Sequence, residues 1–161
     1  MSNYQDGNFD TKYGTITVRN PGRVQAPPNL QTLKRRKANG YTQDAGDIVL
    51  QGPALRAFKA AEIRATPARL RKKDKVQPII LTGVGYRSYS SQASLYYGPN
   101  NTNGTRFADP DGSLHVEGLA VDNNNSLNLF RKAKVKKALL AEGWHYPISG
   151  EPWHASYHLA G

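Results

Sequence analysis

The stretch Ser113-Leu-His-Val-Glu-Gly-Leu-Ala-Val-Asp122, together with Glu151-Pro-Trp-His154, decides how this chain is interpreted. The two segments hold two histidines, in a chain that has four histidines in all. Two imidazoles and one carboxylate form a ligand set that suits zinc and leaves a fourth position open to water, as in catalytic zinc sites. The pattern therefore predicts His115, Asp122 and His154 as metal ligands, and it leaves Glu151 free to act as a base.

The spacing of these residues also predicts how the chain must bend. Gly118 favours a turn after His115, and the short apolar run from Gly118 to Asp122 is typical of a strand that delivers Asp122 at its end. Pro152 makes a helix through Glu151 unfavourable. In an extended segment, positions three apart point to opposite faces. We therefore predict a kink at Pro152 that brings Glu151 and His154 to the same metal.

Three motifs of this chain resemble those of the zinc D-alanyl-D-alanine carboxypeptidase and hedgehog-type peptidase superfamily. The first segment matches S-x-H-x-x-G-x-A-x-D, the second matches E-x-W-H, and Gly85-Tyr-Arg-Ser88 with Gln92 resembles an upstream G-Y-R-S-x-x-x-Q element. The family includes carboxypeptidases, dipeptidases and phage endolysins that cut the peptide stems of peptidoglycan. The resemblance implies an α+β fold in which a small central antiparallel sheet, flanked by helices, carries a zinc site.

The same resemblance implies a role for each matching residue. It makes Zn²⁺ the cofactor, held by His115, Asp122 and His154, with Glu151 as the catalytic base. Arg87 becomes a catalytic donor to a carbonyl or carboxylate oxygen, which suits a guanidinium group. The candidate substrate-binding residues are Ser113, Gln92 and Trp153. From the residues themselves, Ser113 can equally fix the loop before His115, Gln92 can support the site from behind, and Trp153 can pack to hold its segment.

Length and composition favour one soluble domain. The chain has 161 residues, no cysteine and a formal net charge of +10. We expect residues 1–50 to form a loosely ordered arm and residues 51–161 to form the zinc peptidase domain. The first ten residues lack the basic and apolar runs of a secretory signal, and no segment is long and apolar enough to span a bilayer.

The charge predicts attraction to polyanions, and the peptidase motifs favour peptidoglycan and anionic cell-wall polymers over nucleic acid as partners. We therefore expect a protein made in the cytoplasm that acts on the bacterial cell wall, as a phage lysin or a virion component. The basic run Lys34-Arg-Arg-Lys37 is interpreted as a solvated surface rather than as a polyanion contact.

Other elements follow from periodicity and turn residues. We expect a core helix after Gly52-Pro53, a buried strand over residues 78–83, a short helix over 88–97, and a helix over 126–142 with Leu127 and Phe130 facing inward. Residues 98–112 are rich in turn formers and predict a long loop beside the site, which could gate substrate. Glu117 is expected to face solvent.

The sequence leaves the reaction itself open. An endopeptidase that cuts inside the stem is favoured, with a D-alanyl-D-alanine carboxypeptidase as the alternative. A non-catalytic zinc domain of the same fold is a further alternative, against which Glu151 and Arg87 argue. The last is a polyanion-binding module with a vestigial site, which would bind DNA with a steep salt dependence.

Overall fold

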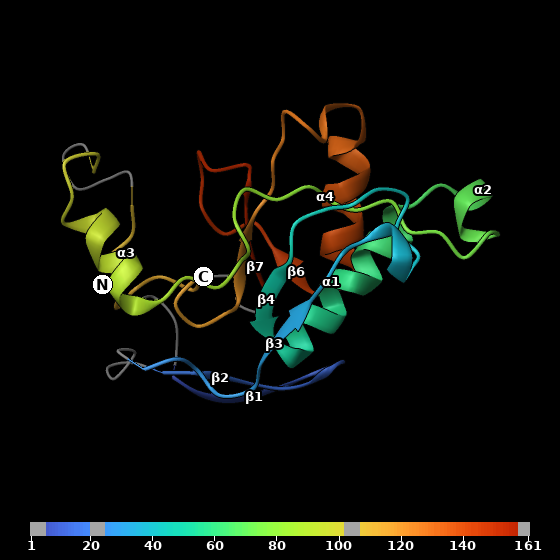
Figure 1. Ribbon diagram of the computed structural model, residues 1–161. Helices are drawn as coiled ribbons and strands as arrows, with labels where there is room; N and C mark the ends of the chain where they lie inside the picture. Colours follow the sequence, from blue (N-terminus) through green and yellow to red (C-terminus); the bar gives the residue numbers. More distant parts are fainter. Residues whose placement is uncertain (1–5, 20–24, 102–106, 158–161) are drawn as a thin grey trace.

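The computed structural model describes residues 6–19, 25–101 and 107–157 (Figure 1). The described strands are β1 (Gly7–Thr11), β2 (Gly14–Val18), β3 (Leu30–Leu33), β4 (Ile48–Gln51), β5 (Ala120–Asp122), β6 (Trp144–His145) and β7 (His154–Tyr157). The described helices are α1 (Gly52–Ala65), α2 (Ala68–Arg71), α3 (Tyr89–Tyr96) and α4 (Lys132–Ala141), with 3₁₀ turns η1 (Lys37–Asn39) and η3 (Leu129–Arg131). The predicted α+β class is confirmed. None of the described helices has the length and apolar content needed to span a membrane.

The core lies between α1, α4 and the sheet formed by β5, β7 and β6 (Figure 1). Pro53 stands at the first turn of α1, where a missing N–H is tolerated, and the apolar stripe of the helix includes Ala54, Ala57 and Phe58. Phe58 meets Trp144 of β6 edge-on, with ring centroids 6.1 Å apart. Aromatic and aliphatic packing thus fixes the back of the sheet that carries the site.

The central sheet has the strand order β5-β7-β6, and both pairings are antiparallel. Its register sets Asp122 of β5 directly opposite His154 of β7. Residues directly opposite each other in an antiparallel pair have neighbouring side chains. The predicted strand that ends at Asp122 is therefore present, and its pairing brings together two residues that lie 32 positions apart.

The amino-terminal segment differs from the predicted loosely ordered arm. Its described residues form a β1–β2 hairpin, and β3 pairs with β4, so the predicted boundary at residue 50 falls inside a paired strand. The alternation Thr15-Ile-Thr-Val turns Ile16 and Val18 into the core. This segment is therefore an integral part of the fold, because burial of these side chains stabilises its attachment.

Two predicted elements between the motifs also differ. The helix expected over 126–142 begins only at Lys132, and Leu127 and Phe130 are exposed by 70% and 100%. The cause is Asn128, which is buried and binds both the N–H and the carbonyl of Ile80, at 3.1 and 2.8 Å. This tether holds residues 125–128 in a turn. The expected strand over 78–83 is extended chain with one bridge, from Leu81 to Asn123.

The helix expected over 88–97 is α3, and the Ser88 hydroxyl caps it by accepting the Ser91 N–H at 3.1 Å. The predicted long loop that follows includes residues 102–106, which lie outside the described residues. Its described residues are 98–101 and 107–112, and the second stretch borders the cleft discussed below. A role of this loop in gating substrate stays a prediction.

Candidate metal centre and cleft

His115, Asp122 and His154 converge on one point. Oδ1 of Asp122 lies 3.2 Å from Nε2 of His115 and 3.1 Å from Nδ1 of His154. One ligand atom from each of the three residues lies within 4.8 Å of the other two. This spacing suits three ligands around one metal ion, since typical ligand distances are about 2.0–2.2 Å. The structure thus assembles the predicted ligand set from a turn and two paired strands.

Hydrogen bonds behind the imidazoles decide which nitrogen of each ring faces the centre. Nδ1 of His115 lies 2.8 Å from the carbonyl oxygen of Gly85, which can only accept, so Nδ1 carries the proton and Nε2 presents a lone pair. Nε2 of His154 lies 3.0 Å from the hydroxyl of Ser156 and can donate to it, leaving Nδ1 unprotonated. Such outer partners orient histidines that ligate metals.

The consequence is that three acceptor atoms face one another. A carboxylate oxygen and two imidazole lone pairs at this spacing repel unless positive charge lies among them. Without a metal ion, protons on the facing nitrogens of His115 and His154 can supply that charge. Burial raises the pKa of Asp122, but the hydrogen bonds and charges of the protonated imidazoles outweigh burial and hold that pKa below its ordinary value. The centre therefore favours an ionised Asp122, which is the form that binds a metal ion.

Two turns carry these ligands. The predicted kink at Pro152 is present, and the His154 N–H donates to the Glu151 carbonyl at 3.1 Å to close it. On the other side, the Gly118 N–H donates to the His115 carbonyl at 3.1 Å, and Gly118 has a φ of 68°. A Cβ at Gly118 would also lie 3.2 Å from the backbone nitrogen of Gln51, so both conformation and space favour glycine there.

Arg87 lies beside the metal centre and is held from two sides. Its backbone N–H donates to the His115 carbonyl at 3.0 Å, and its Nη1 donates to Oε1 of Gln92 at 2.7 Å. Gln92 is buried, and its Nε2 donates to the Ala108 carbonyl at 2.7 Å. Both ends of the Gln92 amide are therefore engaged within the protein, which places Gln92 behind Arg87 as its support.

The other candidates occupy distinct places. Ser113 is buried, and its hydroxyl accepts the His115 N–H at 3.3 Å, so it fixes the loop before that ligand. The expectation that Trp153 packs in the interior is wrong, because its side chain is 40% exposed. The kink at Pro152 turns it outward. Substrate contacts by Ser113 and Trp153 stay predictions.

All eight residues proposed for the site from the sequence line a single cleft of about 740 Å³. Glu151 lies on its wall and is half-buried. The cleft is large enough for a short peptide segment, in the range of small-ligand sites. One cleft therefore holds a metal ligand set, a carboxylate outside that set, and a fixed guanidinium group.

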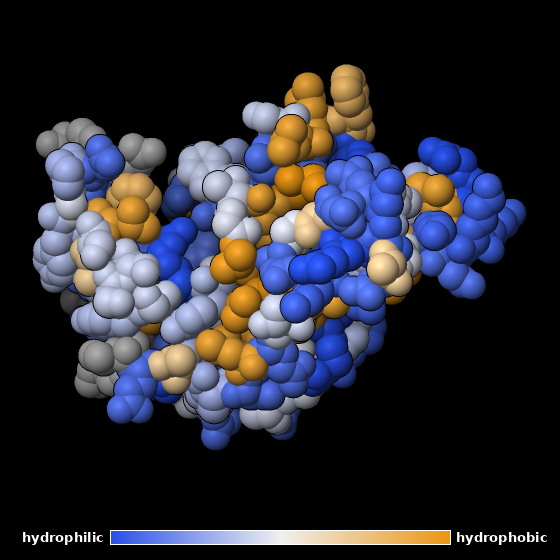
Figure 2. Space-filling model, in the orientation of Figure 1, coloured by the Kyte–Doolittle hydropathy of each residue, from blue (hydrophilic) through white to orange (hydrophobic). Residues whose placement is uncertain are grey.

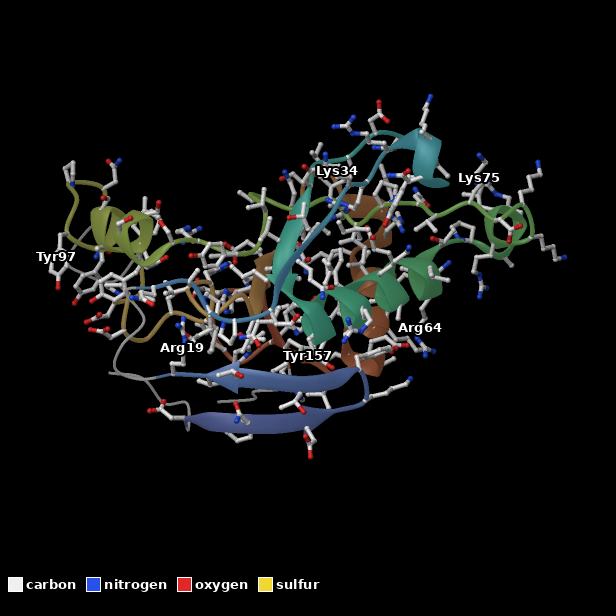
Figure 3. All side chains as sticks on the ribbon, turned by 60° about the horizontal axis from the view of Figure 1, so that its bottom comes forward. Arg19, Lys34, Arg64, Lys75, Tyr97 and Tyr157 are labelled. Atoms are coloured by element: carbon white, nitrogen blue, oxygen red, sulfur yellow. The ribbon has the colours of Figure 1, made fainter. Side chains whose placement is uncertain are left out.

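Buried polar contacts support the turn that carries His115, and one of them differs from expectation. Glu117 was expected to face solvent but is fully buried, and its carboxylate accepts the backbone N–H of Arg19 at 2.7 Å and the guanidinium at 3.3 Å. Gln51 donates to the Glu117 carbonyl at 2.8 Å and to the Thr17 carbonyl at 2.7 Å. Figure 3 shows Arg19 at the end of the amino-terminal hairpin. The hairpin thus braces the turn that carries His115, which no local sequence pattern indicates.

Comparison of the sequence with protein-family models and with curated proteins finds no match. Among solved structures, the chain is similar to the LdcB LD-carboxypeptidase, whose structure was described as revealing the molecular basis of peptidoglycan recognition. The TM-score is 0.46 at 19% sequence identity, and the match covers 99% of this chain and 84% of that chain. This is a similarity of overall outline, and the functional proposal below rests on the site itself.

Proposed function

We propose that this chain is a zinc-dependent peptidase that hydrolyses an amide bond in the peptide stem of bacterial peptidoglycan, cutting inside the stem as an endopeptidase. The observation that carries the proposal is the convergence of His115, Asp122 and His154 on one point, with outer partners that suit the tautomers required for metal binding. The motif resemblance supports the choice of substrate. Action on the cell wall, as a phage lysin or virion component, is part of the same proposal.

The donor set fits zinc better than calcium or magnesium. Two imidazole nitrogens and one carboxylate oxygen suit zinc, whereas the two harder cations take mainly oxygen ligands. When bound, zinc would supply Lewis acidity toward water and toward a carbonyl oxygen. Because only three protein ligands are present among the described residues, and they border an open cleft, a position would remain for reactants.

The chain's own residues would then divide the remaining work. Glu151, which lies outside the ligand set, would accept a proton from the attacking water and transfer it to the nitrogen of the leaving amine. Arg87 would donate hydrogen bonds to the oxygen on which negative charge develops. Gln92 would hold the guanidinium in position, since its own amide is already engaged. These roles require that substrate enter the cleft with its scissile carbonyl between Arg87 and the metal centre.

The experiment that tests this function is mass spectrometry of fragments that the zinc-loaded protein releases from purified peptidoglycan. New amino termini inside the stem are expected. Loss of a single terminal residue would instead show a carboxypeptidase, and an absence of cleavage on walls from several bacterial types would overturn the peptidase proposal. Glu151→Gln is the matched variant, because it removes the carboxylate base, keeps the side-chain shape and leaves the ligand set intact.

Glu151→Gln should bind one zinc per chain, as measured by elemental analysis, and lose about 10²- to 10⁴-fold in turnover, the usual contribution of a general base. His154→Ala should lose both zinc and turnover. A Glu151→Gln variant that cleaved at the wild-type rate would remove Glu151 from the mechanism while leaving the metal assignment in place.

A further inference from the structure

Two basic segments that are distant in the sequence lie side by side. The first is residues 34–44, which include η1, and the second is residues 69–75, which begin in α2. The Thr42 N–H donates to the Val76 carbonyl at 2.8 Å, and the Val76 N–H donates to the Gly40 carbonyl at 2.9 Å. Figure 3 shows Lys75 toward one end of the molecule, Tyr97 near α3 at the other end, and Lys34 between them. We call the outer face of these two segments the basic surface.

The basic surface carries far more positive than negative charge. Its two segments have two exposed carboxylates, Asp44 and Asp74, against eight exposed cations: Lys34, Arg36, Lys37, Arg69, Arg71, Lys72, Lys73 and Lys75. Within residues 6–19, 25–101 and 107–157, none of these eight side chains has an ion-pair partner. Arg35 is the exception in the first segment, because it is buried against Glu62. Figure 2 shows the corresponding hydrophilic lobe around α2.

Turns with defined geometry hold the backbone that carries these cations. Gly40 ends η1 with a φ of 90° and donates its N–H to the Lys37 carbonyl at 3.0 Å. In the second segment Asp74 has a φ of 55°, a conformation uncommon outside glycine, and its N–H donates to the Arg71 carbonyl at 3.0 Å. Like charges held close together repel, so a solvated surface alone gives no reason for this arrangement. A backbone that is already ordered lowers the entropy lost when a polyanion binds.

We propose that the basic surface binds an anionic, phosphodiester-linked polymer of the bacterial cell wall. This choice of partner rests on the proposed function, while the presence of a polyanion site rests on the charge alone. Repeated phosphates along a flexible polymer match cations spread over two segments. The features of nucleic-acid readers are missing from these segments: Tyr41, their one aromatic residue, is buried, and α2 has four residues, so neither base stacking nor groove reading is provided.

The two ends of the molecule would then have separate tasks. Residues of α3 and of the central sheet line the cleft. Figure 1 shows α2, which carries part of the basic surface, on the opposite side of the molecule from α3. A polymer bound at the basic surface would leave the cleft open to a neighbouring peptide stem. Binding would thus raise the concentration of stems near the site without competing for it.

The test is co-sedimentation of the full chain with cell walls that carry phosphodiester polymers, before and after hydrofluoric acid removes those polymers. A chelator prevents cleavage during the measurement. The test variant is Lys37→Gln, Lys73→Gln and Lys75→Gln together. The matched control is Lys132→Gln, Lys134→Gln and Lys137→Gln on exposed positions of α4, which removes the same charge elsewhere.

The expected result is that the test variant loses about tenfold or more in wall affinity at 0.1 M salt, with a flatter salt dependence, while the control changes little. Stripped walls should bind wild type as weakly as intact walls bind the test variant. Equal losses in both variants, or unchanged binding to stripped walls, would overturn the proposal, and so would tighter binding to a 20-base-pair DNA duplex than to intact walls. Cleavage of a soluble stem peptide by the test variant separates this outcome from failure of the peptidase proposal.

Discussion

Among the charged clusters that the described residues bury, two differ in whether their hydrogen bonds leave acceptor atoms without a donor. In the first, Arg35 donates to Oε2 of Glu62 at 2.7 Å, and Tyr41 donates to Oε1 of Glu62 at 3.1 Å. In the second, Asp122 faces His115 and His154. The first cluster pairs a cation with an anion, whereas the second brings three acceptors to one point.

The carboxylates of the two clusters, Glu62 and Asp122, also differ in burial and in the direction of their pKa shift. Glu62 is fully buried, and burial raises its pKa although Arg35 and the Ile79 N–H oppose the change. The Asp122 side chain is 19% exposed toward the cleft, and its pKa is lowered because the two histidines outweigh burial. A buried polar cluster whose groups are all partnered is part of the structure. A cluster of converging acceptors with an opening has the arrangement that a metal ion requires.

We call the cluster of Arg35, Tyr41 and Glu62 the closed cluster, and that of His115, Asp122 and His154 the open cluster. The largest effect on stability should come from breaking the closed cluster. Arg35→Ala leaves Glu62 buried without its cation, and we expect it to lower the free energy of unfolding by about 3–5 kcal/mol. Urea denaturation followed by circular dichroism measures the loss. Lys34→Ala, at an exposed neighbouring position, should change stability by less than about 0.5 kcal/mol. A loss below 1 kcal/mol for Arg35→Ala would show that Glu62 does not depend on Arg35 for its charge compensation.

The open cluster should respond to metal instead. Zinc at a hundred times its dissociation constant should raise the free energy of unfolding of wild type by about 2.7 kcal/mol, by mass action. Asp122→Asn should abolish this gain, because it replaces an anionic ligand with a neutral amide. Thermal denaturation with and without zinc measures both. A gain that survived Asp122→Asn would place the metal elsewhere in the chain.

The two clusters were not equally visible in the sequence. The ligands of the open cluster stand in short motifs, so His115, Asp122 and His154 could be predicted, and Pro152 indicated the kink between Glu151 and His154. The closed cluster joins residues from the amino-terminal segment and α1 that share no local pattern. Its existence depends on tertiary packing, which single-sequence periodicity does not reach.

The same limit explains the other differences. The burial of Glu117 depends on Arg19, which lies 98 positions away, and the late start of α4 depends on the contact of Asn128 with Ile80. In each case a polar side chain finds its partner in a distant segment, and this tertiary contact overrides the local preference. The fold class followed from the family resemblance, and the candidate ligand set followed from residue types and spacing, whereas the contacts that support the site followed from neither.

A smaller effect, on zinc affinity, should come from removing Ser156, the outer partner of His154. The Ser156 hydroxyl lies 3.0 Å from Nε2 of His154 and can accept its proton, so Ser156→Ala should weaken zinc affinity by about tenfold to a hundredfold, as expected for an outer partner of a metal-bound histidine. Competition with a chromogenic chelator measures the affinity. Ser126→Ala, at an exposed position, is the control. Unchanged affinity in Ser156→Ala would mean that the His154 tautomer is set without the hydroxyl.

The smallest effect should come from the support of Arg87, which belongs to neither charged cluster. Gln92→Ala removes the acceptor that holds the guanidinium and should lower kcat about tenfold through poorer positioning, with zinc affinity unchanged. Gln92→Glu keeps an acceptor oxygen and should recover part of the rate. Steady-state kinetics on a soluble stem peptide, together with the chelator assay, separates the two effects. If Gln92→Ala weakened zinc binding as much as catalysis, Gln92 would support the turn that carries His115, through the backbone of Arg87. The metal ligands and the substrate donor Arg87 would then not be supported independently.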